Sequence, residues 1–170
     1  MGVSGSPGSL RALRYAAEEA RAQGAMLFPV LAWMPPGGDL ADRRCPSAYL
    51  RETWRAAAVQ RLTDAIDLAF GGPPDDLLTR PNVIRGEPGP VLVTAACEPG
   101  DLLVVGTGRR GTLERMIRGH VARYCVARAT SPVVAVPPSE LEQASRGLRG
   151  WALRHRAVAP AALPAASSSR

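Results

Sequence analysis

The sequence predicts an α/β protein in which a five-stranded parallel sheet carries helices on both faces. Short apolar runs of strand length alternate along the chain with segments whose apolar residues recur at helical spacing. The apolar runs are continuous, which is typical of strands buried on both faces of a parallel sheet. Right-handed crossovers then limit the topology to a few doubly wound arrangements, with ligands expected beyond the carboxyl ends of the strands.

The predicted elements follow one another in the order β-α-β-α-β-α-β-α-β. The first strand is truncated, because only residues 1–3 precede a helix start formed by Ser6 and Pro7. Gly24 ends that first helix, and residues 34–47 are expected to form a polar loop. The expected strands are residues 1–3, 25–33, 77–85, 101–106 and 132–136. The expected helices are residues 7–23, 48–70, 88–96 and 113–125.

Two parts of the chain differ in composition. Residues 1–138 contain all the predicted strands and form one domain of ordinary size. Residues 139–170 begin as a helix-like segment and end in AVAPAALPAASSSR, a low-complexity stretch that cannot bury a core. We therefore expect a C-terminal tail that is partly helical or disordered.

Composition excludes several classes of function. The net charge is +6, and the basic residues are all arginine, so a Walker-type phosphate loop and lysine Schiff-base chemistry are excluded. This weakly basic balance does not favour nucleic acid as a partner. Cys45, Cys97 and Cys125 show no metal-binding spacing. No apolar run is long enough to cross a membrane and no secretory signal opens the sequence, so a cytoplasmic location is expected.

Several segments together resemble a universal stress protein domain over residues 1–138. They are VSGSPGSLRALRYAAEEARAQGA near the start, RGEPGPVLVTAA and DLLVVGTGRRG in the middle, and RYCVARATSPVVAVPP at the end. The resemblance implies the strand order 3-2-1-4-5 and a stress-response role through regulated binding and dimerisation. It also implies homodimers made by antiparallel pairing of the last strand, Pro132 to Val136. Some members of the family bind ATP at the carboxyl ends of strands 1 and 4.

The residues at that position can be compared with the family motif G-x2-G-x9-G-[S/T]. Gly106 and Gly119 match its first and third glycines, whereas Arg109 stands at the second glycine and His120 at the hydroxyl position. Ser4 stands where nucleotide-binding members have an aspartate. The resemblance thus implies a degenerate adenine-nucleotide site, for ATP or AMP, formed by Ser4, Ala32, Val105, Gly106, Arg109, Gly119, His120 and Val121.

The altered positions leave alternatives open. Arg109 either bonds a phosphate, fills the space of the phosphate, or points into solvent. His120 either donates to a phosphate, better when protonated near pH 6, or is an ordinary helix-surface residue. One hypothesis is therefore an ATP or AMP sensor that uses Arg109 and His120. Another is a weak ATPase, although no residue is indicated as catalytic, so a non-enzymatic role is favoured.

Overall fold

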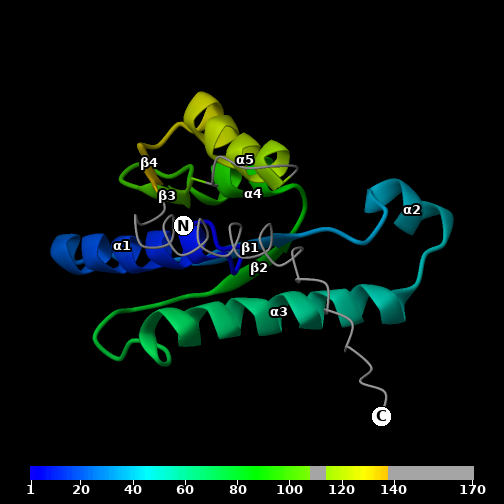
Figure 1. Cartoon of the computed structure of the whole chain (residues 1–170), viewed down its shortest axis with the longest axis horizontal. Helices are drawn as coiled ribbons and strands as arrows, with labels where there is room; N and C mark the ends of the chain where they lie inside the picture. The colour runs from blue at the N-terminus through cyan, green and yellow to red at the C-terminus, as the bar shows by residue number, and fades with distance from the viewer. Residues whose placement is uncertain (108–113, 138–170) are drawn as a thin grey trace, which may run out of the picture. The chain divides into compact units, whose positions relative to one another are not determined.

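The computed structural model describes residues 1–107 and 114–137, and for residues 114–120 it describes the backbone alone. The predicted tail, residues 139–170, lies outside the described residues, so the domain boundary stays a prediction. Five helices and four strands are present in the described part of the chain (Figure 1). The helices are α1 (Pro7–Gln23), α2 (Gly38–Arg44), α3 (Ala48–Phe70), α4 (Pro88–Ala95) and α5 (Glu114–Arg128). The strands are β1 (Val30–Trp33), β2 (Asn82–Arg85), β3 (Leu103–Gly106) and β4 (Val133–Val136).

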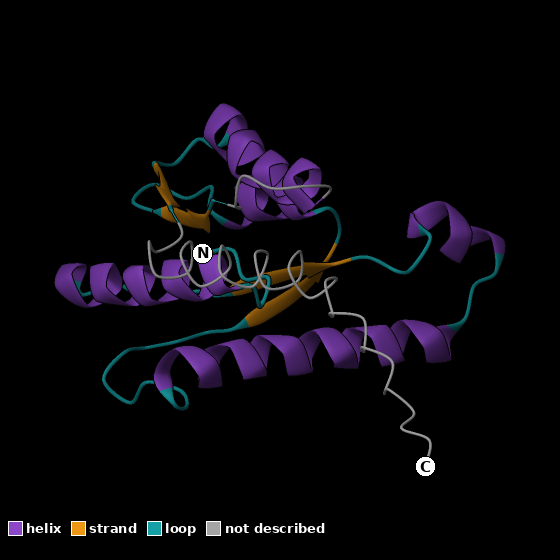
Figure 2. Ribbon diagram, viewed as in Figure 1, coloured by secondary structure: helices purple, strands orange, loops and turns teal. Residues whose placement is uncertain are grey.

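The strands pair in parallel, as predicted, but in two sheets. β1 pairs with β2 and β3 pairs with β4, which gives two two-stranded sheets where one five-stranded sheet was expected (Figure 2). The difference arises at the start of the chain. The predicted first strand, residues 1–3, is reduced to an isolated bridge between Gly2 and Val30, and the backbone turns away after it at Gly5, with φ +70°. A left-handed φ is a conformation that glycine adopts readily and that ends an extended segment.

The N-terminal residues nevertheless connect the two sheets by backbone hydrogen bonds. The Gly2 N–H donates to the Val104 carbonyl of β3 at 3.0 Å. On the other side, the Val3 N–H donates to the Val30 carbonyl of β1 at 2.8 Å, and the Val30 N–H donates to the Met1 carbonyl at 2.8 Å. Residues 1–3 therefore lie between β1 and β3.

Helix α1 confirms the start and stop signals in the sequence. The Ser6 side chain accepts from the Ser9 N–H at 3.3 Å, and Pro7 occupies the first turn, where its missing N–H costs nothing. Gly24 ends the helix in the left-handed conformation, φ 62°. The residues that face the core are small or aliphatic, and they are buried. They are Ala12, Leu13, Ala16, Ala17 and Ala20.

Two apolar cores lie on opposite faces of the strands. Successive residues of β3 belong to different cores, because successive side chains of a strand point to opposite faces. Val104 belongs to the core that includes side chains of α1 and α3, and Leu103 and Val105 belong to the core that includes side chains of α4 and α5. Figure 1 shows α4 and α5 together, apart from α1 and α3. The chain thus has helices on both faces of its strands.

The first two strands are shorter than the apolar runs predicted. β1 begins at Val30 and β2 at Asn82, each directly after a proline. Pro29 lacks the N–H that would continue the ladder with β2, so regular pairing begins only after it. Pro81 removes no bond of this ladder, because the N–H groups that face β1 are those of Arg80 and Asn82. Before the prolines, pairing is limited to an isolated bridge between Leu27 and Thr79.

Helix α2 occupies the segment predicted as a loop, and an ion-pair network holds it. The guanidinium of Arg85, the last residue of β2, donates to Asp39 at 2.7 Å and to Asp42 at 2.8 Å. Arg51 of α3 approaches Asp42 at 3.9 Å. The Asp42 side chain is 6% exposed, and the hydrogen bond from Arg85 holds the pKa of Asp39 below its usual value. These charges tie α2 to both β2 and α3.

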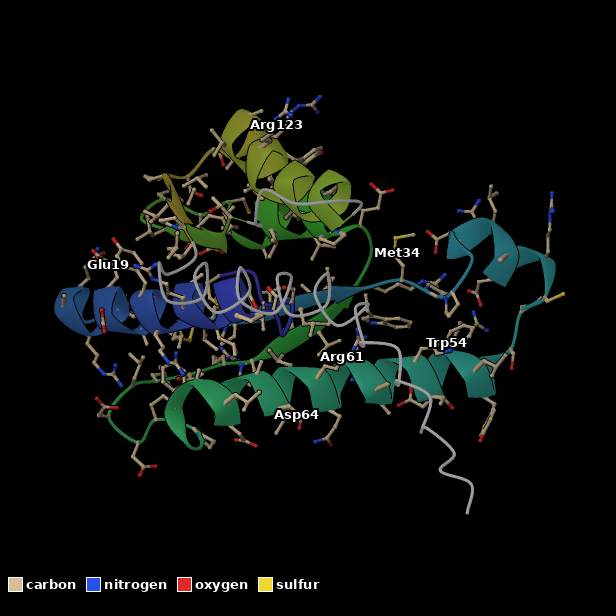
Figure 3. The ribbon with its side chains drawn as sticks, viewed as in Figure 1. Glu19, Met34, Trp54, Arg61, Asp64 and Arg123 are labelled. Carbon is tan, nitrogen blue, oxygen red and sulfur yellow. The ribbon has the colours of Figure 1, made fainter. Side chains whose placement is uncertain are left out.

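Replacing the buried carboxylate tests this network. We expect Asp42→Ala to lower the free energy of unfolding by about 1–2 kcal/mol, because a charged hydrogen bond is lost and Arg85 keeps only its more exposed partner. Urea unfolding followed by circular dichroism gives the value. Asp64→Ala on the exposed face of α3 is the matched control, and an equal effect of the two substitutions would contradict the role of Asp42 (Figure 3).

Candidate functional site

Three predicted site residues lie in one row at the carboxyl ends of the strands. Gly2 pairs with Val30 and donates to Val104, and all three segments run in parallel. Two residues further along each segment are Ser4, Ala32 and Gly106. Because parallel strands advance by the same rise per residue, Ser4 and Ala32 lie at the same level, and Gly106 lies within one residue of that level. The structure thus brings Ser4, Ala32 and Gly106 to the edge where ligands bind in sheets of this kind.

Serine hydroxyls connect this edge to the start of α1. The Ser4 hydroxyl lies 3.0 Å from the Ser6 hydroxyl, and the Ser4 N–H donates to the Ser9 hydroxyl at 3.3 Å. The Ser9 hydroxyl in turn donates to the Ser6 carbonyl at 2.9 Å. Ser4 is exposed, so its hydroxyl faces the solvent side of the edge. The resemblance implies an aspartate here in nucleotide-binding members, and the neutral hydroxyl of Ser4 is a weaker acceptor than a carboxylate.

Gly106 is required by a close backbone contact. A Cβ atom at this position would lie 2.6 Å from the Gly8 carbonyl oxygen and 3.2 Å from the Ser9 nitrogen. These are main-chain atoms of the first turn of α1, which cannot move as a flexible side chain would. The end of β3 and the start of α1 therefore approach each other more closely than any other residue type allows.

The two sides of this contact respond differently to alanine. We expect Gly106→Ala to lower the free energy of unfolding by about 1–3 kcal/mol, because the added methyl group must displace backbone. Gly8→Ala is the matched control, since its Cβ would meet the Thr107 carbonyl at an ordinary 3.6 Å and glycine is unfavourable within a helix. Urea midpoints compare the two variants. A Gly106→Ala protein as stable as Gly8→Ala would contradict the contact.

The apolar members of the predicted site belong mainly to the core. Val105 is 3% exposed, and Val121 of α5 packs against the same core from the helix side. Ala32 is half-buried in β1. The side chains of Val105 and Val121 thus serve packing in this structure, and Ala32 is the apolar member that reaches the surface of the edge.

The remaining predicted residues lie in the segment between β3 and the middle of α5. Arg109 lies outside the described residues. Gly119 and His120 lie within α5, whose backbone is described there, while the His120 side chain lies outside the description. Their roles toward a phosphate stay predictions.

The sequence analysis missed α2 and the arginine that holds it. A signal was present in GDLADRR, where Asp39 lies in the first turn and Arg43 and Arg44 in the last, which suits the helix dipole. The partnership of Arg85 with Asp39 and Asp42 spans more than 40 residues and had no local signal.

Among the side chains that the structure describes, those of residues 1–107 and 121–137, no group of three or more His, Cys, Asp or Glu is arranged to hold a metal ion. No described helix combines the length and the apolar character needed to cross a membrane.

Parallel strands with helices on both faces define an α/β protein. A profile of the universal stress protein family matches residues 1–137, and the chain belongs to that family. A relative from Thermus aquaticus, described as a universal stress protein in the QAH/OAS sulfhydrylase 3′ region, is 32% identical over 137 residues. The match covers 80% of this chain and 95% of the relative.

Solved structures agree with this assignment. A universal stress protein in complex with cAMP is 29% identical, with a TM-score of 0.58, and the match covers 82% of this chain and 95% of that one. The universal stress protein UspA from Lactobacillus plantarum is 17% identical with a TM-score of 0.56, covers 79% of this chain and 93% of its own, and supports the fold alone.

Proposed function

We propose that this universal stress protein acts by regulated binding and that it forms a homodimer through β4. The observation that carries the proposal is the composition of this edge strand. Its residues, Val133 to Val136, include no charged side chain. The unpaired backbone groups of an edge strand can bond to other chains. Natural edge strands therefore usually carry charges, prolines or bulges that prevent such pairing. β4 is flanked by Pro132 and Pro137 but carries no charged residue between them, and such an apolar edge favours pairing with a second copy.

The hydrogen-bond register identifies which backbone groups are available. Leu103 and Thr107 donate to the Pro132 and Val136 carbonyls at 2.9 and 2.8 Å. In a parallel ladder, alternate residues of one strand face the partner strand, so the even-numbered residues of β4 face β3. The backbone groups of Val133 and Ala135 are directed the other way. They can bond an antiparallel β4 of a second copy.

The proposal extends to the sheet as a whole. The backbone bonds of residues 1–3 to β1 and β3 support a single sheet in the order 3-2-1-4-5, with residues 1–3 at its centre and β4 at one edge. Pairing of two β4 edges would then continue that sheet across the dimer.

Proline at position 135 tests the edge directly. Ala135→Pro removes an outward N–H that β3 does not use, so the fold is expected to persist while the pairing is lost. Light scattering coupled to size exclusion should show a dimer for the unchanged protein and a monomer for the variant. Ala135→Ser, which keeps the N–H, is the control and should remain dimeric. A monomeric unchanged protein would overturn the proposal.

A second candidate function is the sensing of an adenine nucleotide at the carboxyl edge. It is favoured by the 29% identical universal stress protein solved with cAMP. Ser4 and Gly106 lie beside the first turn of α1, and the N-terminus of a helix is a position that favours an anion such as phosphate. This hypothesis assigns the phosphate contacts to Arg109 and His120, which stand at the second glycine and the hydroxyl position of the family motif.

Calorimetric titration with ATP, AMP and cAMP tests this candidate. We expect saturable binding of at least one nucleotide, with Arg109→Gly lowering its affinity because a charge-assisted phosphate contact is lost. Arg61→Ala on the exposed face of α3 is the control for loss of positive charge. A gain of affinity in Arg109→Gly would mean that this arginine fills the phosphate space. Absence of heat at millimolar nucleotide would rule out the sensor.

A further inference from the structure

A groove runs between α1 and the edge strand β4. Its volume is about 470 Å³, with Arg11, Arg14, Tyr15 and Glu18 along one wall and β4 with Pro137 along the other. The four α1 side chains are exposed and lie on the side of the helix opposite its buried alanines. The groove therefore borders the same strand edge that the proposed dimer uses.

The charged residues along the α1 wall of the groove make different contacts. The Arg14 guanidinium donates to the Leu68 and Ala69 carbonyls at 2.9 and 3.0 Å, so it fastens the end of α3 to α1. Arg11 donates through one nitrogen to the Pro137 carbonyl at 3.0 Å. Among the described residues, neither Arg11 nor Glu18 forms an ion pair. One cation and one anion of the groove thus keep their charges available for a partner.

We propose that a second copy of the chain occupies this groove, with Arg11 of each copy paired to Glu18 of the other. The inference rests on the proposed β4 pairing and adds the side chains that set its register. Antiparallel pairing of two β4 strands places a two-fold axis perpendicular to the sheet, which keeps both α1 helices on the same face and antiparallel to each other. In such an isologous contact, if residue i meets residue j, then j meets i.

The spacing of the charges suits this symmetry. Arg11 and Glu18 are seven residues apart, which is two turns and about 10 Å along one face of the helix. Tyr15 lies near the middle of that interval, where the axis would pass. Helix α1 packs against β3 and β4, and strands lie about 4.8 Å apart, so the two helices would run about 10–15 Å from each other. Long side chains such as arginine and glutamate can bridge that gap.

Charge reversal tests the pairing. We expect Arg11→Glu to raise the dimer dissociation constant about tenfold, because two surface ion pairs become two like-charge contacts. Glu18→Arg should have the same effect, and the double variant Arg11→Glu/Glu18→Arg should restore the affinity of the unchanged protein. Analytical ultracentrifugation at low salt gives the constants. Arg123→Glu on α5 is the matched control, since its side chain points away from the strands, and it should leave the dimer unchanged (Figure 3).

The outcomes separate this inference from the dimer itself. A dimer that Ala135→Pro disrupts, but that neither single reversal weakens, would overturn the ion pairing while the β4 interface stands. Weakening by both single variants without recovery in the double variant would also overturn it, because the two charges would then act separately. Urea midpoints of all variants show whether the fold is intact. Weakening of the unchanged dimer by added salt, with the same slope in the double variant, supports the pairing.

Discussion

Three backbone hydrogen bonds of the N-terminal residues hold the described fold together. Two strands alone are marginally stable, and the structure contains two such pairs. The bonds from Gly2 to Val104 and between residues 1–3 and Val30 align these pairs side by side and in parallel. That alignment creates the two faces on which α1 and α3, and α4 and α5, bury their apolar side chains. It also sets the common level of the strand ends.

The position of α1 follows from this alignment and from one close contact. The first turn of α1 touches the end of β3 at Gly106, and no side chain can be inserted between them. Packing alone explains why this position is a glycine. Gly106 is thus no evidence for nucleotide binding by itself, and the case for a phosphate contact rests on Arg109 and His120. The same position of α1 places Arg11 and Glu18 beside β4, where a second copy would meet them.

The sequence predicted those features that depend on interactions between residues close together in the chain. Ser6, Pro7 and Gly24 marked the ends of α1, and the glycines after Phe70 marked the end of α3, because caps and turns act over a few residues. The strands at residues 25–33 and 77–85 were predicted too long, since Pro29 interrupts their pairing inside an apolar run. The contact of Gly106 with Gly8, and the ion pairs of Arg85, join residues far apart in the chain. Such partners cannot be found from local patterns, so these contacts were not predicted, and a ligand site at the strand ends stays a prediction.

In the proposed dimer, β4 pairs with β4 of a second copy. Hydrogen exchange of the β4 amides, followed by NMR as a function of protein concentration, measures this most directly. The account predicts that the Val133 and Ala135 amides become protected as the dimer forms, whereas the Val134 and Val136 amides, which face β3, are protected at every concentration. Rapid exchange of Val133 and Ala135 at all concentrations would contradict it.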